Sequence, residues 1–337
     1  MFDIALPIIQ APMAGGPDTP ALAAAVSAAG GLGSLGCAYL SPAQIETAAA
    51  EVRRRTDRPF ALNLFVRSDA PDDPAAETRV LPILSAFRTE LGLGPPAVAT
   101  AATPDLGAQL EAVLRAAPRV FSFTFGVPSR DQLAAVRARG IAIVGTATTV
   151  DEARALDDAG VDAICAQGAE AGGHRGTFLG DFDDALVGTL ALVPQIARAT
   201  KLPVIAAGGI MTGEGIRAAL ALGASAVQLG TAFLACDEAG TPPAYRAALA
   251  TAAATTVTRA FSGRAGRGIR NRMTDAFARV APAPFPQQQR LTGELRRAAA
   301  HQGRTDVMQL WAGQGAPLAR AMPAGQLVAT LAREAGL

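Results

Sequence analysis

The residues best suited to catalysis lie in one short stretch, Ala166–Gly176, which reads AQGAEAGGHRG. It holds four glycines, a glutamate, an arginine and His174, which is one of only two histidines in the 337 residues. Glycines let the backbone approach a ligand closely, and an imidazole can exchange a proton near neutral pH. A lone histidine after a strand is usually an ordinary turn residue, but the neighbouring glycines and charges favour an active-site loop. His174 is therefore the candidate catalytic residue.

Two later loops have the composition of an anion site. Residues 207–213 read AGGIMTG and residues 228–231 read QLGT. Their glycines expose backbone N–H groups, and Gly213 opens a predicted helix whose N-terminus would favour an anion. Tight packing alone can also require such glycines. Because both loops follow the last two predicted strands, where this kind of fold often holds phosphate, we predict a phosphate site there.

Side-chain amides at other strand ends suggest what carries the phosphate. Asn63 lies in the third predicted strand, and Gln167 ends the sixth. An amide offers a donor and an acceptor together, as the edge of a flavin ring requires, although buried amides are common without any ligand. The turn Pro12–Gly15 can cover one face of such a ring. The chain has no Walker motif, HExxH sequence or paired metal-ligand spacing, so we expect a phosphorylated planar cofactor and no metal.

The elements that would position these residues alternate regularly along the chain. Apolar segments predict eight strands, which are separated mostly by helix-like segments and predict a (β/α)8 TIM barrel. The predicted strands are Ile8–Pro12, Leu32–Gly36, Phe60–Val66, Val120–Phe125, Ile141–Thr146, Asp162–Gln167, Pro203–Ala207 and Ala226–Gly230. In such a barrel the carboxyl ends of the strands carry the active site.

One motif points away from this interpretation. Gly31-x-Gly33-x-x-Gly36 matches the dinucleotide-binding fingerprint. In that fingerprint the glycines follow a strand and open a helix, whereas here a helix precedes them and they lie within the predicted strand. We therefore do not expect a Rossmann site.

Two segments interrupt the alternation and predict a second, smaller, mostly helical domain that covers the active site. It comprises residues 67–118 and about 236–312, and the barrel comprises 1–66, 119–235 and about 313–337. The second segment contains an arginine- and glycine-rich loop, Arg259–Arg272. We interpret it as a solvated loop, with contact to an anion as the alternative, because it lacks the interleaved aromatics of a nucleic-acid site.

Composition narrows the partners. The formal net charge is +1, so we expect neither nucleic acid nor a membrane surface as a partner. The uncharged run Ala218–Cys236 is interrupted by polar residues and glycines and is interpreted as protein core. The three cysteines are far apart, without CxxC spacing, and no signal peptide is evident. We therefore expect a cytoplasmic protein, either a monomer or a homodimer.

Several segments together resemble the nitronate monooxygenase family, formerly called 2-nitropropane dioxygenases. They run in the family's order along nearly the whole chain, and EAGGHRG is the most specific of them. The segments are Gln10–Gly16, Asn63–Val66, Gln167–Gly176, Ala207–Ile210, Gln228–Leu234 and Leu310–Gly315.

The resemblance implies an FMN-dependent barrel that oxidises alkyl nitronates with molecular oxygen to a carbonyl compound and nitrite. Family members can act on propionate 3-nitronate, which implies a role in detoxification. His174 would be the catalytic histidine. By motif, the FMN-binding residues would be Met13, Asn63, Gln167, Gly172, Gly209, Gln228, Leu229, Gly230 and Thr231.

The chain departs from the family around the substrate. Some relatives place several tyrosines and a lysine there, whereas this chain has only Tyr39, Tyr245 and Lys201, and offers phenylalanine and amides in Phe285–Gln289. The substrate preference therefore does not carry over. An NAD(P)H-dependent flavin reductase, acting on quinones or enoyl thioesters, is the alternative enzyme. A non-catalytic flavin-binding sensor is the alternative outside catalysis, and the titratable His174 speaks against it.

Overall fold

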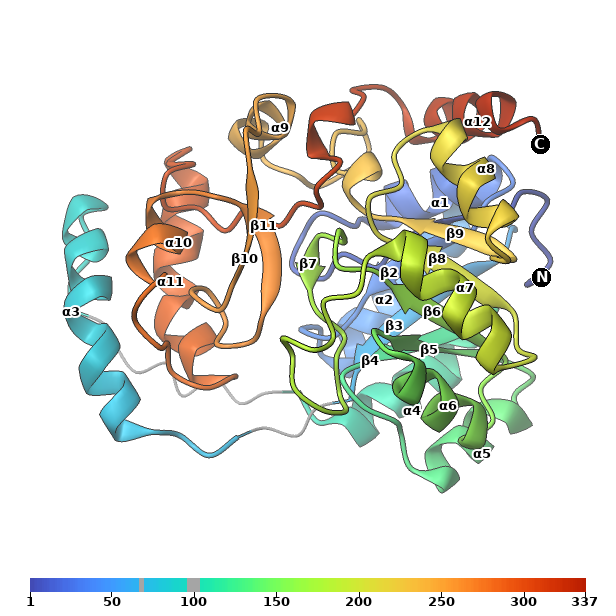
Figure 1. Cartoon of the computed structure of the whole chain (residues 1–337), viewed down its shortest axis with the longest axis horizontal. Coiled ribbons are helices and arrows are strands. Elements are labelled where there is room, and N and C mark those ends of the chain that lie inside the picture. The colour runs from blue at the N-terminus through green and yellow to red at the C-terminus, as the bar shows by residue number, and fades with distance from the viewer. Residues whose placement is uncertain (67–69, 96–103) are drawn as a thin grey trace.

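The computed structural model describes residues 1–66, 70–95 and 104–337. Figure 1 shows a barrel with a smaller lobe beside it. Within these ranges, eight parallel strands form one sheet in the order β1-β9-β8-β6-β5-β4-β3-β2. They are β1 (Ile8–Gln10), β2 (Gly33–Gly36), β3 (Phe60–Phe65), β4 (Val120–Thr124), β5 (Ala142–Ala147), β6 (Ala163–Gln167), β8 (Val204–Ala207) and β9 (Ala226–Leu229).

Backbone contacts between the first and last strands of this order close the sheet. Ile9 forms a parallel bridge with Leu32, and the Gln10 N–H donates to the Leu32 carbonyl at 2.9 Å. The TIM barrel predicted from the sequence is therefore confirmed. The glycine motif lies where expected: Gly33 and Gly36 belong to β2, and a Cβ on Gly33 would lie 1.9 Å from the Ala23 carbonyl oxygen, so that glycine serves close packing.

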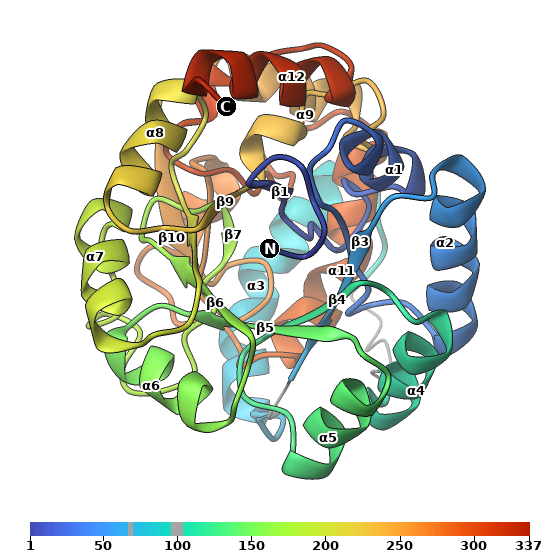
Figure 2. The same ribbon diagram turned by 90° about the vertical axis from the view of Figure 1, so that its right-hand side faces the viewer.

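Helices surround the barrel, as Figure 2 shows along its axis. Thr19 and Ser41 cap the first two of them, each accepting a hydrogen bond from a backbone N–H three residues later. The surrounding helices are α1 (Pro20–Ala28), α2 (Pro42–Arg55), α4 (Leu106–Ala116), α5 (Arg130–Ala138), α6 (Val150–Asp158), α7 (Thr189–Ala199), α8 (Gly213–Ala221) and α12 (Ala324–Ala335). The last helix lies beside α1 and α8, which agrees with the predicted return of the C-terminal segment.

The structure differs from the predicted division at α4. Sequence placed it with the smaller domain, yet its apolar face, which includes Leu110 and Val113, packs in the barrel core with Ile45 and Val52 of α2. The inserted part is therefore shorter than residues 67–118, and residues 67–69 and 96–103 of that segment lie outside the described ranges.

Small and branched side chains together fill the inside of the barrel. Ala61, Ala163 and Ala226 share a buried cluster with Ile9, and Phe2 belongs to the same cluster. The N-terminus therefore occupies the end of the barrel that faces the viewer in Figure 2. The opposite end, where the strands finish, faces the lobe.

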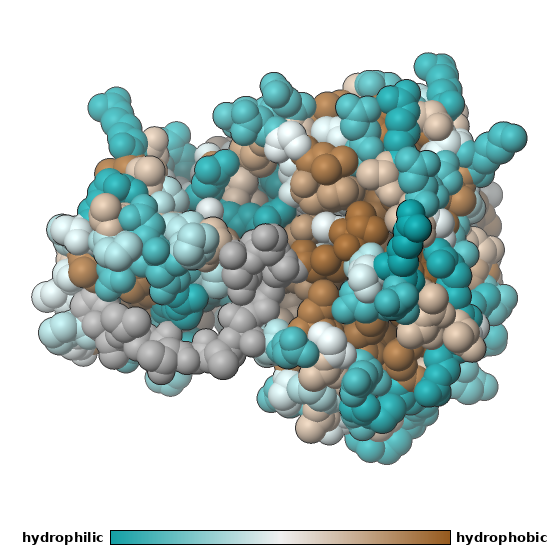
Figure 3. Space-filling model, turned by 90° about the horizontal axis from the view of Figure 1, so that it is seen from below, coloured by the Kyte–Doolittle hydropathy of each residue, from teal (hydrophilic) through white to brown (hydrophobic). Residues whose placement is uncertain are grey.

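The lobe has a hydrophobic core of its own, which includes Val80, Leu84, Phe261 and Leu295. It is built from α3 (Pro74–Glu90), α9 (Pro243–Ala250), β10 (Thr255–Thr258), β11 (Gly266–Ile269), α10 (Arg272–Ala276) and α11 (Gln287–His301). Seen from below in Figure 3, apolar residues gather on the barrel, whereas the lobe is mostly hydrophilic. The helices of the described ranges are too short or too polar to cross a membrane.

The hairpin of β10 and β11 is a feature that the sequence did not predict. Residues 236–312 were expected to be helical and irregular, but the antiparallel strands β10 and β11 pair there. β11 also pairs with β7 (Gly173–His174), so Gly266 lies opposite His174 and Arg267 opposite Gly173. The lobe is thus joined by backbone hydrogen bonds to the loop that carries the candidate catalytic residue.

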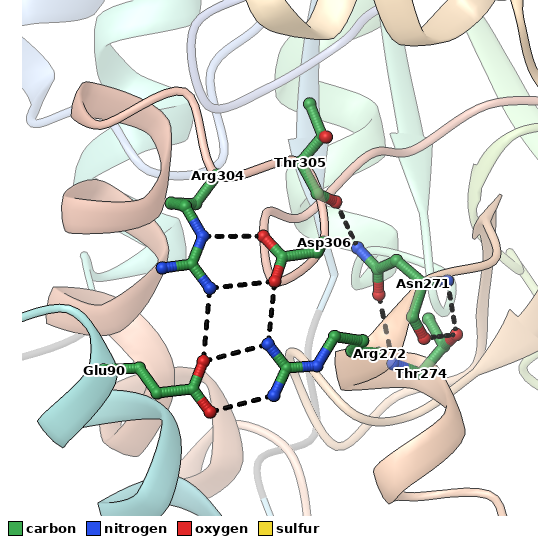
Figure 4. Close-up of polar contacts among 7 residues, drawn as sticks. All are labelled: Glu90, Asn271, Arg272, Thr274, Arg304, Thr305 and Asp306. Carbon is green, nitrogen blue, oxygen red and sulfur yellow. Dashed lines mark hydrogen bonds and ion pairs between the residues drawn. The ribbon is translucent and has the colours of Figure 1, made fainter.

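Four charged side chains form a closed network on the outer side of the lobe (Figure 4). Arg272 contacts Glu90 at 2.8 Å and Asp306 at 2.9 Å. Arg304 contacts the same two carboxylates, at 3.2 and 2.9 Å. The network joins the end of α3 to the start of α10 and to the segment after α11. Isolated surface ion pairs contribute little to stability, whereas a network of several charges contributes more.

Candidate active site

A cavity of about 1010 Å³ lies between the carboxyl ends of the barrel strands and the lobe. Its size is at the upper end of the usual range for ligand pockets. Every site residue predicted from the sequence borders it: Met13, Asn63, Gln167, Gly172, His174, Gly209, Gln228, Leu229, Gly230 and Thr231. The structure therefore brings the predicted residues together, whereas their roles toward a cofactor stay predictions.

The glycine loops after β8 and β9 form the floor of the cavity. Gly208 and Gly209 have φ values of +122° and +72°, which L side chains rarely adopt. The backbone N–H of Gly209 has no acceptor among the described residues. At Gly230, a Cβ would lie 3.4 Å from the Ala11 Cβ and 3.9 Å from the Met13 sulfur, so a larger side chain would extend along Met13. These loops leave room and backbone donors for an anionic group, which fits the phosphate of FMN.

The N-terminus of α8 does not contribute to this floor. Its Gly213 N–H donates to the Glu334 carboxylate at 3.2 Å, and Thr212 accepts from the Gly215 N–H. Glu334 is held in turn by Arg320 at 2.6 Å. The expectation that this helix end binds an anion of a ligand is therefore wrong, because a carboxylate of the protein already takes that position.

The strand amides differ in how much of their hydrogen-bonding capacity the protein uses. Gln167 donates to the His174 carbonyl at 3.0 Å and accepts from the Gly176 N–H at 2.8 Å, so it holds the active-site loop. Asn63 donates to the Ser122 hydroxyl at 2.9 Å, and Gln228 donates to the Cys165 sulfur at 3.3 Å. The amide oxygens of Asn63 and Gln228 accept no hydrogen bond from the described residues and remain suited to a flavin edge.

A buried carboxylate holds the Pro12–Gly15 turn against the barrel. One oxygen of Asp18 accepts from the backbone N–H of Met13 at 2.7 Å and of Gly36 at 2.6 Å. Burial raises the pKa of Asp18 to about 6, although the hydrogen bonds from Gly36 and Met13 act in the opposite direction. Asp18 thereby fixes the turn that was predicted to cover the cofactor.

The ring of His174 is held by a serine and surrounded by aromatic side chains. Its Nε2 lies 2.8 Å from the Ser262 hydroxyl. Four aromatic rings have centroids 5.2 to 6.5 Å from the imidazole. They belong to Phe65, Phe125, Phe285 and Trp311. This apolar cage restricts water around the imidazole.

The surroundings keep this imidazole neutral. Loss of water around the ring, together with the positive charges of Arg264 and Arg296, lowers the pKa of His174 from 6.5 to about 3. At neutral pH the ring therefore has one protonated and one unprotonated nitrogen. It can accept a proton or a hydrogen bond, but it adds no positive charge to the cavity.

Phe125 adopts an unusual backbone conformation at the end of β4. Its φ is +80°, which is an outlier for a bulky residue. The ring packs on Phe65 with centroids 4.4 Å apart, and the guanidinium of Arg264 lies 3.8 Å from its centroid. Strained residues of this kind often occur at functional sites, and Phe125 borders the cavity.

The arginine-rich loop is only partly solvated. Arg270 and Arg272 are exposed and pair with carboxylates of the protein, whereas Arg264 is half-buried and Arg267 is buried. Arg264 donates to the Thr177 carbonyl, and Arg267 donates to the Ala169 carbonyl at 2.8 Å. The buried Arg175 donates to the carbonyls of Gly168 and Gln167 at 2.5 and 2.9 Å. The interpretation as a solvated loop therefore holds only for the exposed arginines, since Arg264 and Arg267 bind carbonyls in or next to the active-site loop.

On the lobe side, α11 borders the cavity with arginine side chains and with the glycine Gly293. The guanidinium of Arg296 donates hydrogen bonds to the Thr292 hydroxyl, to the Gln309 amide oxygen at 2.7 Å and to the Gln289 carbonyl. It has no carboxylate partner among the described residues. Gly293 has no neighbour closer to a Cβ position than an Arg297 nitrogen at 3.6 Å. This side of the cavity is thus roomier and more positive than the floor.

Several residues of the site have no recognisable signal in the sequence. Asp18 lies in a turn-like segment where an aspartate is unremarkable. Ser262 and Phe125 are common residue types that belong to no recognisable motif. For Trp311 the signal was available, because it is the only tryptophan of the chain and lies in a segment that resembled the family. Among the described residues, no group of three or more histidines, cysteines and carboxylates is placed to hold a metal ion.

Known proteins resemble this chain over nearly its whole length. A family model described as nitronate monooxygenase matches residues 1–334. A nitronate monooxygenase of Pseudomonas aeruginosa is 48% identical over 99% of this chain and 97% of its own length. One of Paraburkholderia phytofirmans is 46% identical over 99% and 93%.

Solved structures agree with the sequence matches. The nitroalkane oxidase from Streptomyces ansochromogenes superposes with a TM-score of 0.94 at 43% identity, covering 99% of this chain and 96% of that one. FabK from Thermotoga maritima has a TM-score of 0.74 at 28% identity, with 99% and 94% covered.

Proposed function

The chain belongs to the nitronate monooxygenase family, and we propose that it binds FMN and oxidises alkyl nitronates, including propionate 3-nitronate, with molecular oxygen. The products are a carbonyl compound and nitrite. The observation that carries the proposal is the single cavity in which the glycine floor, the strand amides and His174 meet.

Distinct parts of the floor would hold the cofactor. The backbone at Gly209, Gly230 and Thr231 would bind the phosphate, because it offers donors and leaves space that a side chain would fill. Asn63 and Gln228 would bind the edge of the ring through their amides. Met13 would lie beside the ring on the turn fixed by Asp18. When bound, FMN accepts electrons from the substrate and passes them to oxygen.

The residues of the chain would then bind and orient the substrate. A nitronate is already deprotonated at carbon and needs no base, so His174 would orient it within the aromatic cage. A neutral nitroalkane must first lose a proton from carbon, and the neutral imidazole is able to accept it. Arg296 would attract the anion, since it has no carboxylate partner in the described part of the chain.

Two measurements test the proposal. Heat-denatured protein should release FMN, identified by chromatography, and an FAD peak would contradict the cofactor assignment. In the absence of oxygen, ethylnitronate or propionate 3-nitronate should bleach the flavin absorbance, whereas NADH and NADPH should not. Bleaching by a nicotinamide alone would overturn the proposal in favour of a flavin reductase. Bleaching by none of these donors would favour a flavin-binding sensor.

A further inference from the structure

We propose that Ser262 is a positioning residue that holds His174 as the tautomer protonated at Nε2, which leaves the lone pair on Nδ1. The tautomer follows from hydrogen bonding alone. Its consequence for catalysis rests on the proposed function. Neither the motifs around His174 nor the family resemblance points to Ser262, which lies 88 residues further along the chain.

Ser262 is built into the structure as a fixed hydrogen-bonding group. Its side chain is buried, with 1% of the residue exposed. The hydroxyl lies 2.8 Å from the His174 Nε2 and 3.1 Å from the Arg264 carbonyl. It also accepts from the Arg264 N–H at 3.3 Å. Gly263, with φ of +85°, allows the tight turn that brings this N–H and carbonyl to the same hydroxyl.

Counting protons separates the two possible tautomers. A serine hydroxyl has one proton and can donate it only once. With Nε2 protonated, the imidazole donates to Ser262, Ser262 donates to the Arg264 carbonyl, and the Arg264 N–H donates to Ser262. With Nδ1 protonated, Ser262 must donate to Nε2, and the Arg264 carbonyl loses its partner. The first arrangement has one more hydrogen bond, and leaving a buried polar group without a partner is unfavourable.

The other ring nitrogen is left for the cavity. Nδ1 of His174 has no hydrogen-bond partner among the described residues, and the residue borders the cavity. The lowered pKa of His174 agrees with a neutral ring, in which one nitrogen keeps its lone pair. We infer that Nδ1 is the atom available to a substrate.

This assignment specifies the proton transfer. With a neutral nitroalkane, Nδ1 takes the proton from the carbon next to the nitro group. The C–H bond breaks, an N–H bond forms, and the electron pair of the C–H bond enters the nitronate. This step places a positive charge on a ring whose burial and neighbouring arginines disfavour it, and the Nε2–H bond to Ser262 offsets part of that cost. With a nitronate, no proton moves and Nδ1 has no proton to donate.

Nuclear magnetic resonance of ¹⁵N-histidine protein tests the tautomer directly. The chain has two histidines, and a His301→Gln variant assigns the spectrum. In flavin-loaded wild type at pH 7, we expect Nε2 of His174 to have the shift of a protonated nitrogen and Nδ1 that of an unprotonated one. A protonated Nδ1, or rapid averaging of both tautomers, would overturn the proposal. The wild-type spectrum alone establishes the tautomer of His174, even if the variants fold poorly.

Variants test what maintains the tautomer and what depends on it. Ser262→Ala should mix the tautomers, whereas Ser262→Thr keeps a hydroxyl and should preserve the Nε2–H form. His301, which is exposed, should not change in either. Ser262→Ala should also lower kcat/KM for nitroethane at least about tenfold more than for ethylnitronate, since base catalysis typically contributes 10²- to 10⁴-fold.

The outcomes separate this inference from the proposed function. A protein that oxidises neither substrate contradicts the proposed function, while the spectra still decide the tautomer. If His174 keeps the same tautomer in Ser262→Ala, another group determines which ring nitrogen is protonated, and the proposed role of Ser262 is refuted. Equal losses on both substrates would refute its link to the base.

Discussion

The two sides of the cavity are built differently. On the barrel side, backbone and small residues at the ends of neighbouring strands form the surface, and the sheet register fixes them: Gln167 pairs with Ala207, and Ala207 with Gln228. On the lobe side, single side chains from a hairpin, a helix and irregular segments project into the space. Examples are Gln289, Arg296 and Trp311.

This difference indicates where variation is tolerated. Changing one floor residue alters a surface that three strands share, and that surface must match a whole cofactor. Changing one residue of the lobe alters one wall and leaves the floor intact. We therefore expect the barrel side to determine whether flavin binds and the lobe side to determine which substrate is accepted.

The same substitution on each side gives the largest expected contrast. Gly230→Val should yield nearly colourless protein, because the new side chain would extend along Met13 into the floor. Gly293→Val adds the same group on α11, where a Cβ meets only an Arg297 nitrogen at 3.6 Å. It should keep its flavin and raise KM for nitronates. The flavin absorbance per protein and steady-state kinetics measure both effects.

Gly230 is a better choice for this test than Gly209. The φ of Gly209 is +72°, so valine there would also strain the backbone. Thermal melts of both variants serve as the control for folding. If Gly230→Val stays fully yellow, or if Gly293→Val loses its flavin, the division between the two sides is wrong.

His174 belongs to the barrel but is held by the lobe, so its substitution sharpens the comparison. His174→Asn should lower kcat/KM for nitroethane by about 10²- to 10⁴-fold, the usual contribution of a general base. Oxidation of ethylnitronate, which needs no base, should largely persist. Kinetics at matched flavin content check this. Equal losses on both substrates would mean that His174 mainly binds the substrate.

A smaller effect should distinguish the stability of the two parts. Arg272→Ala opens the four-residue network that joins α3 to α10, and should make the lobe more susceptible to proteolysis, more at low salt than at high salt. Arg320→Ala removes the matched pair with Glu334 on the barrel and should leave the lobe unchanged. Mass spectrometry of the first cleavage sites distinguishes them. Cleavage at the same barrel sites in both variants would contradict the expectation.

The smallest effects concern the pH dependence of stability. Asp18 has a pKa of about 6 in the folded state against 3.8, so the folded state binds its proton more tightly and stability falls as pH rises from 4 to 6. His174 has a pKa of about 3 against 6.5, so the unfolded state binds that proton and stability falls as pH decreases from 6.5. The two effects oppose each other between pH 4 and 6.

Single variants separate them. Asp18→Asn should make stability rise more steeply with pH in this window, and His174→Asn should make it rise less steeply. Each slope should change by at most about 1.4 kcal/mol per pH unit, the value for one proton. Urea unfolding at several pH values measures this. Parallel curves for wild type and Asp18→Asn would show that Asp18 titrates normally.

The barrel side was predictable because its signals are local. Apolar segments such as Phe60–Phe65 and glycines just after strands are visible in the sequence, and the fold brings strand ends together. α4 was misplaced because the inserted segment made its connection to β3 unusually long. The α8 terminus was misjudged because its partner, Glu334, lies 121 residues away.

The lobe side was less predictable because its signals are weak or distant. In β11, GRGI, two glycines conceal a strand that exists through pairing with β10 and β7. Arg264 and Arg267 resemble solvent-exposed arginines until their carbonyl partners on another loop are known. The contact of Ser262 with His174 depends on how the lobe sits on the barrel, which no local pattern encodes.

The pairing of β7 with β11 has a mechanical consequence. Because Gly266 lies opposite His174 in that small sheet, the histidine is coupled to the lobe by backbone bonds rather than by side chains alone. A displacement of the hairpin away from the barrel would carry the imidazole with it, away from the floor where the cofactor would lie. Any opening of the lobe would therefore also move His174 out of the site, and its return would bring His174 back in the same movement.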